Sequence, residues 1–540
     1  MKDEVDVIHQ RIFRRCTMRT LATALFFFAI AIFISTPLYA QEEGDYQTRD
    51  SGDWSDPQIW ESFNGSSWAA IGEPPSGSET ITVLSTEERT DSVFVDVELS
   101  ITGHLINQGI VAIEDSLDIA DGGIYQHDRD EGQIPSARWA DGSTLLITGT
   151  EATAPENRNQ SYHDIIFDTP GLLSNLHMDL NDVTISGDIR VVDSGLARWY
   201  LTSATANEGS TITILGDVIV EGGAFSVQGT SNANTTFVVD HYGNIEVTGG
   251  NFSISRGSQG NGTTTWSLYE GDFSMSNATT QSSTATPGGA RFVFASDGTQ
   301  TLTLGEGIEF SALPVEVSSG TTLEMGPSTL AGSGIFVLNE GGTIATELAG
   351  GVAEIFEGVV AEVTLEDNAS FEFNGSTAQV TSEMMPMVVS DLIIDNPEGV
   401  ALSQETTING VLRLQAGIFD NTIPFTLGND ASISLEGGSL LQDVSSEAGD
   451  ELPRTLFVDQ NFPNPFNPTT TIRYGLPSAS QVSVKVYNVL GQEVETLFEG
   501  HMSAGVHEYT FDAGDLSSGM YIYRFKSENQ VVSKRMMLVE

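Results

Sequence analysis

The chain has 540 residues, of which 39% are hydrophobic, and a formal net charge of −52 at pH 7. So strong a negative charge argues against nucleic acid or an anionic membrane surface as a partner, because both are polyanions and would repel the chain. The length exceeds what one compact core usually organises, which predicts either several domains or an elongated repeat fold.

Residues 1–40 have the pattern of a signal peptide. Basic residues between Arg11 and Arg19 precede an apolar run over residues 21–34, and Ala40 supplies the small residue expected at the cleavage point. The run is shorter than the roughly 20 residues that a helix needs to cross a bilayer, so we expect no transmembrane segment in the mature chain. The single cysteine, Cys16, precedes this run, so no disulfide is expected after cleavage. The sequence leaves open whether translation starts at Met1 or Met18.

Residues 41–79 are expected to form an N-terminal cap segment. Three tryptophans, Trp54, Trp60 and Trp68, lie in this segment and are followed by a proline-rich turn. Their flat faces would suit a sugar-stacking platform. We favour the alternative of a hydrophobic plug over the first coil of a repeat fold, because an open coil leaves unpaired strand edges.

Charge divides the chain near residues 449–453. Residues 41–450 hold 61 acidic and 10 basic side chains, all ten of them arginine, whereas residues 451–540 hold 10 acidic and 7 basic side chains. We favour a solvated acidic surface suited to salty water, where ions screen the self-repulsion. The alternative is calcium bound between turns, for which no ligands can be assigned. No other cofactor is expected.

A repeat is visible in the glycines of the central region. Turns at Gly187, Gly216, Gly243 and Gly271 recur at intervals of 29, 27 and 28, and each precedes a short strand with alternating apolar residues. Each turn also follows a strand of the same kind. The inward pairs of these preceding strands are expected at Val183 and Ile185, Ile212 and Ile214, Phe237 and Val239, and Trp266 and Leu268.

A period of about 28 residues with two or three strands per unit is typical of a β-solenoid. We therefore predict an all-β fold in which a right-handed β-solenoid, or β-helix, covers residues 80–443. An array of β-sandwiches is the competing architecture, because the period is clean over only about 90 residues. The strand at Phe273–Met275 is ambiguous, since it aligns with either of two strands in the preceding unit.

No catalytic residue can be assigned in residues 41–450. The best cluster is His127-Asp128-Arg129-Asp130 with Arg138-Trp139, which combines an imidazole, carboxylates and an aromatic ring, although we favour a charged surface turn. An arginine such as Arg190, Arg256 or Arg413 could serve a lyase as a base in principle. A serine hydrolase elbow at Gly332-Ser333-Gly334 has the wrong spacing.

Residues 444–458 are expected to be a polar linker, followed by a small immunoglobulin-like β-sandwich over residues 459–540. Three prolines make residues 460–469 an extended lead-in. Six strands are then predicted, divided by turn formers that include Gly491, Gly500 and Gly519. Their ranges are 470–474, 481–488, 493–498, 505–511, 520–527 and 530–539, and the expected core includes Val482, Val484, Val486, Leu497, Tyr509, Tyr521 and Tyr523.

The same segment resembles the type A C-terminal sorting domain of the type IX secretion system of Bacteroidetes-like bacteria. An Asn-Pro-rich opening, a Tyr-Asn turn, several glycines and a basic end carry the resemblance. The matching residues are Asn461, Pro463, Asn464, Pro465, Phe466, Asn467, Pro468, Tyr487, Asn488, Gly491, Gly505, Gly519, Tyr521 and Lys534. The resemblance implies recognition by the type IX translocon, export through the periplasm and the outer membrane, and either release or attachment to surface lipopolysaccharide.

We therefore expect an exported cell-surface or secreted protein with a structural, adhesive or binding role. The alternative is a carbohydrate-active enzyme, a polysaccharide lyase or glycoside hydrolase, on the same β-helix scaffold. Fold alone does not discriminate between these functions, because the long polar faces of a solenoid suit extended glycans in both cases. The sequence favours the first function and does not identify the ligand.

Overall fold

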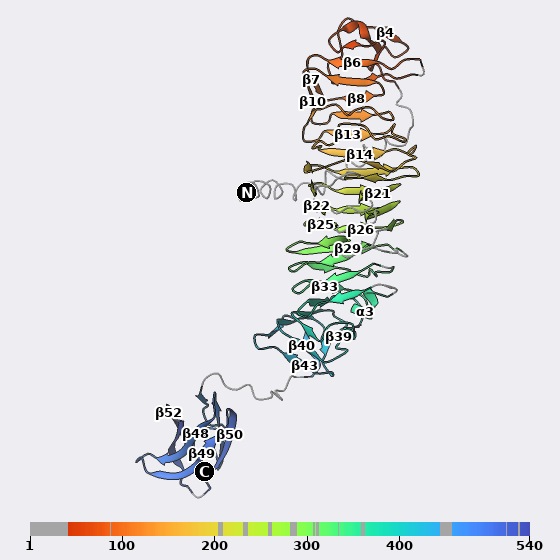
Figure 1. Ribbon diagram of the computed structural model, residues 1–540. Helices are drawn as coiled ribbons and strands as arrows, with labels where there is room; N and C mark the ends of the chain where they lie inside the picture. The colour runs from red at the N-terminus through yellow and green to blue at the C-terminus, as the bar shows by residue number, and fades with distance from the viewer. Residues whose placement is uncertain are drawn as a thin grey trace. The chain divides into compact units, whose positions relative to one another are not determined.

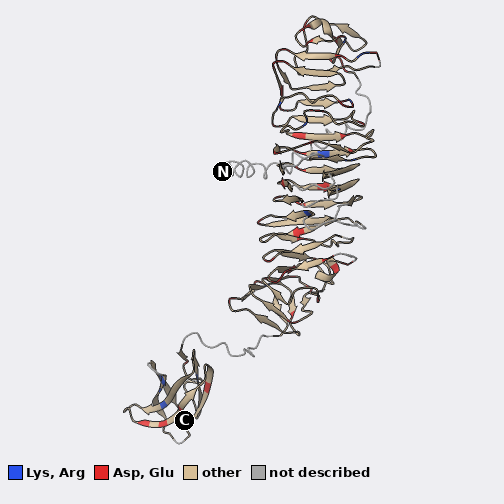
Figure 2. Cartoon of the chain, viewed as in Figure 1, with Lys and Arg blue, Asp and Glu red and all other residues tan. Residues whose placement is uncertain are grey.

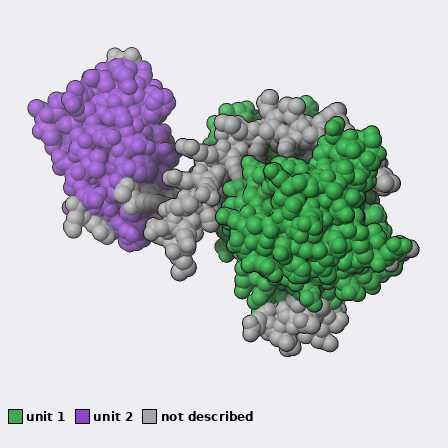
Figure 3. Space-filling view, turned by 90° about the horizontal axis from the view of Figure 1, so that it is seen from above, with its two compact units in different colours: residues 1–441 green, residues 442–540 purple. Residues whose placement is uncertain are grey.

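In the computed structural model, the described residues are 41–539 except 87, 203–208, 230–235, 257–261, 281–288, 306–307, 309–312, 333, 358–361, 443–455, 515 and 528–529. The chain divides into two compact units, residues 1–441 and residues 442–540 (Figure 3). The predicted signal peptide and most of the predicted linker lie outside the described residues. Acidic residues are spread along the first unit, and the strands of the second carry both acidic and basic residues (Figure 2).

The first unit is a β-solenoid of about 14 turns, which confirms the predicted fold (Figure 1). One face runs along the solenoid as a series of parallel strands that pair with one another in chain order. In chain order these strands are β5 (Thr80–Val83), β8 (His104–Asn107), β11 (Ile124–His127), β13 (Thr144–Ile147), β14 (Asp164–Asp168), β17 (Ile189–Asp193), β20 (Val218–Val220), β23 (Ile245–Val247), β26 (Phe273–Met275), β29 (Thr299–Leu304), β31 (Thr322–Glu324), β33 (Thr343–Thr346), β35 (Ser370–Phe373), β38 (Leu392–Asp395), β41 (Val411–Ala416) and β44 (Ser432–Leu435).

Strands on two further faces complete many of the coils, and their sheets are also parallel. In the first coils they consist of β2 (Gly52–Asp53), β6 (Ser92–Val95), β9 (Ile110–Ile113), β7 (Glu98–Ile101), β10 (Ser116–Ile119) and β12 (Arg138–Trp139). The middle coils contribute an eight-stranded sheet of β16 (Val183–Ile185), β19 (Ser210–Ile214), β22 (Thr236–His241), β25 (Thr263–Leu268), β28 (Ala290–Phe294), β30 (Val315–Val317), β32 (Phe336–Leu338) and β34 (Val363–Leu365). Beside it lies a five-stranded sheet of β15 (Leu176–His177), β18 (Trp199–Tyr200), β21 (Ala224–Gln228), β24 (Asn251–Ser255) and β27 (Thr279–Thr280).

The last coils and the N-terminal end complete the first unit. The last coils hold β36 (Gln379–Val380), β39 (Val400–Ala401), β42 (Ile418–Asp420), β45 (Ser439–Leu440), β37 (Val388–Val389), β40 (Thr406–Ile408) and β43 (Phe425–Leu427). A single helical turn, α3 (Val352–Ile355), interrupts one coil. At the N-terminal end, β1 (Tyr46–Thr48) pairs in parallel with β5 and antiparallel with β3 (Trp60–Phe63), which pairs with β4 (Trp68–Ala70). The 3-10 turn η1 (Pro57–Ile59) leads into β3.

The glycines of the repeat pack against the coil before them. A Cβ atom on Gly216 would collide with the carbonyl group of Gly187, and one on Gly243 would collide with that of Gly216. Successive coils therefore approach closely at this corner, and only glycine leaves room for the neighbouring backbone. This contact explains why the glycines recur at the coil interval.

The Asp or Asn after each glycine links one coil to the next. The backbone N–H of Asp217 donates to Oδ1 of Asp188 at 2.7 Å, that of Asn244 to Oδ1 of Asp217 at 2.7 Å, and that of Asp272 to Oδ1 of Asn244 at 3.0 Å. Each side chain thus satisfies a donor that the turn leaves unpaired. The Gly-Asp pattern in the sequence therefore reflects a column of hydrogen bonds along the solenoid.

Inward side chains form apolar rows along the solenoid axis, and one row differs from the prediction. Ile212 pairs with Val239, and Ile214 pairs with His241, so Phe237 lies one inward position earlier than expected. His241 is fully buried in a row of aliphatic side chains, with Nε2 2.8 Å from the carbonyl oxygen of Gly216. Because a histidine interrupts the apolar alternation at this inward position, the sequence alone predicted the wrong register for this strand. The ambiguous strand Phe273–Met275 pairs with β23 and so belongs to the first face.

The coil length changes along the chain, which explains why the repeat was clear only in the centre. Register pairs lie 20 residues apart at Thr144 and Asp164, 29 apart at Ile189 and Val218, and 21 apart at Leu412 and Ile433. Turns of different length therefore connect strands that stack equally well. The parallel pairing of successive coils excludes the competing array of β-sandwiches for the described coils.

The second unit consists of two antiparallel sheets, consistent with a β-sandwich. One sheet holds β46 (Phe457–Val458), β47 (Thr469–Leu476) and β50 (Gly505–Asp512), and the other holds β49 (Glu493–Met502), β48 (Ser480–Asn488), β51 (Gly519–Ser527) and β52 (Gln530–Leu538). The expected core positions are buried except Tyr509, which is partly buried. Gly500, predicted as a turn, lies within β49 opposite Val482, because the hairpin with β48 continues to Met502.

Candidate functional site

The side chains of the cluster at His127 form hydrogen bonds within their own turn and to neighbouring coils of the solenoid. His127, at the end of β11, is fully buried, and its Nε2 lies 2.8 Å from the carbonyl oxygen of Glu131. Burial lowers the pKa of His127 to about 4, so the imidazole is neutral at physiological pH. Oδ2 of Asp128 accepts a hydrogen bond from Gln108, and its Oδ1 accepts one from Thr148.

The remaining members of this cluster also bind neighbouring coils. Oδ1 of Asp130 accepts hydrogen bonds of 2.8 to 3.0 Å from the backbone N–H groups of residues 151–153. Burial would raise the pKa of Asp130, but these donors outweigh it and lower the pKa. Arg138 pairs with Asp118 at 2.6 Å, and Trp139 donates to Gln160 at 3.1 Å. These contacts join neighbouring coils, and the fully buried His127 distinguishes the cluster from the exposed charged turn that we favoured.

The three tryptophans of the N-terminal segment differ in their surroundings. Trp54 and Trp60 are buried, with ring centroids 4.9 Å apart in an edge-to-face arrangement. Their indole N–H groups donate to the carbonyl oxygens of Pro75 and Trp54, respectively. Trp68 is only partly buried and packs on Phe63. Trp54 and Trp60 thus close the core of the first coils and offer no free face to a sugar.

A second polar cluster, which sequence analysis missed, lies on the outward side of the first face in the later coils. The outward positions of β31, β35 and β41 carry Glu324, Glu372 and Arg413, and Asp395 ends β38. Burial, and then the carboxylates of Glu324 and Asp395, raise the pKa of Glu372 above its ordinary value, while Arg413 opposes them. Only an alignment of coils of unequal length would have brought these residues together.

The other candidate arginine in a strand is engaged in an ion pair. Arg190 binds Glu221 through two hydrogen bonds of 2.6 and 3.0 Å. Nearby, burial, and then the carboxylates of Asp193 and Glu221, raise the pKa of Asp168. Arg256 is exposed after β24.

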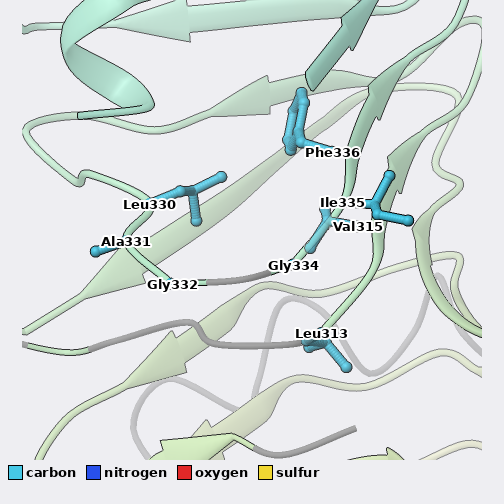
Figure 4. A pocket seen from close by; sticks show the side chains of 8 residues that line it. All are labelled: Leu313, Val315, Leu330, Ala331, Gly332, Gly334, Ile335 and Phe336. Atoms are coloured by element: carbon cyan, nitrogen blue, oxygen red, sulfur yellow. The ribbon is translucent and has the colours of Figure 1, made fainter. Parts of the chain in front are cut away.

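A small apolar cavity of about 20 Å³ lies between the coils near β30 and β32 (Figure 4). Its lining includes Leu313, Leu330 and Phe336, together with Gly332 and Gly334 of the rejected hydrolase pattern. Ser333 lies outside the described residues. A volume of this size holds about one water molecule, so the cavity is too small for an organic ligand.

Metal ligands and membrane-spanning helices are two further features that could indicate a function. In the described part of the chain, no three His, Cys, Asp or Glu side chains are grouped so that they could hold a metal ion. Among those same residues, no helix has the length and the apolar character needed to cross a membrane.

The Asn-Pro segment of the second unit is bound to the sandwich at both ends. Asn461 is buried and donates from Nδ2 to Oγ1 of Thr470 at 2.9 Å. Phe466 is buried against Phe511, and its backbone N–H donates to the carbonyl oxygen of Met537 at 2.9 Å. The lead-in is non-helical, as its prolines predicted.

The other residues of the Asn-Pro segment face solvent. Pro463, Asn464, Pro465, Asn467 and Pro468 are exposed. Asn464 nevertheless accepts a hydrogen bond of 2.8 Å from the backbone N–H of Met537. The segment thus presents a row of polar and proline side chains on a fixed backbone.

The turn between β48 and β49 is fixed by Asn488. Its Oδ1 accepts hydrogen bonds of 3.0 Å from the backbone N–H groups of Leu490 and Gln492. Gly491 has φ of +77°, a left-handed conformation that favours glycine. The guanidinium of Arg524 lies 4.8 Å from the centroid of the Tyr487 ring. The Tyr-Asn-Gly pattern is therefore a turn signal.

The last residues of the predicted sorting signal lie on the strands that follow. Gly505 begins β50 with φ of +137°, and Gly519 begins β51. Tyr521 is buried and donates from its hydroxyl to the carbonyl oxygen of Ser517 at 2.8 Å. Lys534 lies on β52 opposite Tyr523. These residues all belong to one folded unit.

Comparison with known proteins identifies this unit. Residues 460–539 match the family model described as the secretion system C-terminal sorting domain. Searches of curated proteins and of solved structures each return no match. The second unit is therefore a secretion system C-terminal sorting domain, and it marks the chain for export to the cell surface or the extracellular space.

Proposed function

We propose that the exported solenoid acts as a structural, adhesive or binding scaffold at the cell surface or outside the cell. The observation that carries this proposal is a row of outward polar side chains in register on the eight-stranded sheet: Thr184, Thr213 and Asp240. Neighbouring strands lie about 4.8 Å apart. An extended, hydroxyl-rich polymer such as a glycan would meet several of these groups at once.

A pair of tyrosines beside this row supports a glycan as the ligand. The rings of Tyr242 and Tyr269 stack with centroids 5.3 Å apart, and both residues are partly exposed. Asp240 shares a hydrogen bond with Tyr269. Aromatic edges next to a carboxylate acceptor combine the apolar and polar contacts that a sugar ring uses.

Binding of the mature chain, residues 41–540, to a panel of polysaccharides and surface lipopolysaccharide tests this function. We expect saturable binding to at least one of them, weakened at least tenfold in the double variant Tyr242→Ala with Tyr269→Ala. The matched control is Tyr487→Ala, which removes a partly buried tyrosine from the sorting domain. Absence of binding across the panel would contradict an adhesive role toward glycans.

We further propose that the exposed part of the Asn-Pro segment is what the type IX translocon recognises. Asn467 and Pro468 face solvent, whereas Phe466 supports the core. The double variant Asn467→Ala with Pro468→Ala should reduce export while leaving the unfolding temperature of the domain unchanged. Phe466→Ala should reduce both. Normal export of the double variant would exclude these two residues from recognition.

A carbohydrate-active enzyme remains a second candidate because of the cluster around Glu372. A carboxylic acid of raised pKa beside further carboxylates is the arrangement that glycoside hydrolysis uses. The test is release of oligosaccharides or unsaturated products from pectin, alginate and other marine polysaccharides. Turnover that Glu372→Gln abolishes would replace the scaffold function by an enzymatic one.

A further inference from the structure

The two ends of the solenoid differ in how far their apolar side chains are covered. At the N-terminal end, the buried rings of Trp54 and Trp60 cover the core, and none of residues 41–79 is a large hydrophobic residue with an exposed side chain. At the other end, Leu427, Leu435 and Leu441 are 38%, 66% and 51% exposed. Figure 1 shows β43 at this second end, away from β4. The apolar core is therefore closed at one end only, within the described residues.

Two of the exposed leucines, Leu427 and Leu435, occupy positions that the preceding coil buries. Leu435 pairs with Leu414, and Leu427 pairs with Ile408, and both of these partners are fully buried inward residues. The last coil, residues 423–441, thus presents an ordinary inward row that lacks a following layer. Burying such side chains against another apolar surface is favourable, because it removes that surface from water.

The described strands of the last coil each pair with the preceding coil on one side only. Among the described strands, β43 pairs only with β40, β44 only with β41, and β45 only with β42. Within the described residues, each outer edge thus lacks a partner strand, and an open edge favours pairing with another strand. One extended peptide could satisfy a single edge. An occupant that covers the whole end must offer three strand edges around an apolar centre.

We propose that the last coil is a self-complementary interface by which two copies of this chain join end to end. The end of the solenoid that carries the tryptophan plug offers no exposed apolar row. The last coil of a second copy does offer three strand edges around such a row. Two copies related by a two-fold axis form a closed, isologous contact, so the assembly stops at a dimer.

The symmetry fixes which strands meet. A two-fold axis in the plane of the last coil, passing through β44, reverses the direction of the chain in the second copy. β44 then pairs antiparallel with its own copy, and β43 pairs with β45 of the partner. β44 is the longest of the three strands with four residues, while β43 and β45 have three and two. The two shorter strands thus differ in length by only one residue.

Charge sets the conditions under which the dimer forms. Two copies of a chain with net charge −52 repel each other at low ionic strength. The last coil itself carries only two acidic residues, Asp430 and Glu436, and Glu436 lies 3.7 Å from Arg413. Salt screens the repulsion between the remaining charges over about 8 to 10 Å. The dimer should therefore tighten as salt is added.

Analytical ultracentrifugation of residues 41–540 over a range of protein and salt concentrations tests the proposal. We expect a monomer–dimer equilibrium that shifts toward dimer with salt, and Leu435→Asp should weaken it at least tenfold. The control is Leu173→Asp, because Leu173 is 67% exposed on the side of an earlier coil. Circular dichroism establishes that both variants are folded. A monomer under every condition, or a dimer that Leu435→Asp leaves unchanged, would overturn the proposal.

Cross-linking tests the geometry separately. The only cysteine in the sequence is Cys16, so a single introduced cysteine reports on one place. Ser434→Cys on β44 should give a covalent dimer with a short bifunctional maleimide, because β44 faces its own copy. Ser66→Cys, exposed in the N-terminal segment, should not. Equal cross-linking of both variants would exclude the end-to-end arrangement.

Discussion

The solenoid and the sorting domain are both all-β, but their strands find their partners by different rules. In the solenoid, the same contacts recur from coil to coil, as the columns at Gly216 and Asp217 show. In the sorting domain, each strand has partners of its own, and antiparallel pairs such as β48 and β49 are joined by short turns. A recurring contact makes the solenoid depend on small residues at its corners, whereas unique pairings make the sorting domain a self-sufficient unit.

The largest effect is expected from removing one unit altogether. Deletion of residues 459–540 should abolish export, because the sorting domain is the signal for export. The solenoid should retain its unfolding temperature, because each unit has its own hydrophobic core. Cell fractionation and thermal unfolding measure the two outcomes. Conversely, a reporter protein fused to residues 459–540 should reach the surface. Normal export of the truncated chain would break the separation between the two units.

A single methyl group at a coil corner should produce the next largest effect. Gly243→Ala places a Cβ against the carbonyl group of Gly216, and we expect a loss of about 3 kcal/mol in the free energy of unfolding. The control is Gly72→Ala, where no atom lies within 4 Å of the added carbon. Chemical denaturation compares the two variants. Equal stability would show that the coils can separate at this corner without cost.

Buried histidines should make the solenoid sensitive to acid. Burial lowers the pKa of His104, His127 and His241 to about 4. Between pH 6.5 and pH 4 these imidazoles are protonated in the unfolded chain but remain neutral in the folded chain. The free energy of unfolding therefore falls as the pH falls. At pH 4.5 the loss is about 2 to 3 kcal/mol for each histidine.

One variant isolates the contribution of a single histidine. His241→Leu should reduce the stability difference between pH 7 and pH 4.5, as measured by denaturant unfolding. His501→Leu, at an exposed position of the sorting domain, should leave that difference unchanged. An unaltered difference in His241→Leu would mean that this imidazole is protonated without loss of structure.

The smallest effect concerns one hydrogen bond between coils. Asp217→Ala removes the acceptor of the backbone N–H of Asn244 and should cost about 1 to 2 kcal/mol. Asp217→Asn keeps an acceptor oxygen, as Asn244 does naturally toward Asp272, and should cost much less. Denaturant unfolding separates the two variants. Equal losses would mean that charge, and not the hydrogen bond, is what this position requires.

Sequence analysis succeeded where local patterns decide the structure. The strands of the sorting domain follow largely from alternation and turn residues. Gly500 was wrongly predicted as a turn, because a hairpin partner overrode its turn preference, and β46 lies in the segment predicted as a linker. The solenoid was predicted from coils of nearly constant length. Its register at His241 was not, because hydrophobicity is a poor guide to a buried imidazole that hydrogen-bonds to a backbone carbonyl. The cluster at Glu372 needed the stacking of unequal coils, which only three-dimensional structure reveals.

The Asp column also bears on how such a chain can change in evolution. Because Asp188 supplies to Asp217 the same acceptor that Asp217 supplies to Asn244, the loss or duplication of one whole coil would join equivalent partners on either side. Such a change would leave the contacts of the tryptophan plug and of the sorting domain as they are. The number of coils is thus a quantity that gene duplication can adjust freely, whereas no strand of the sorting domain can be removed without orphaning its neighbours.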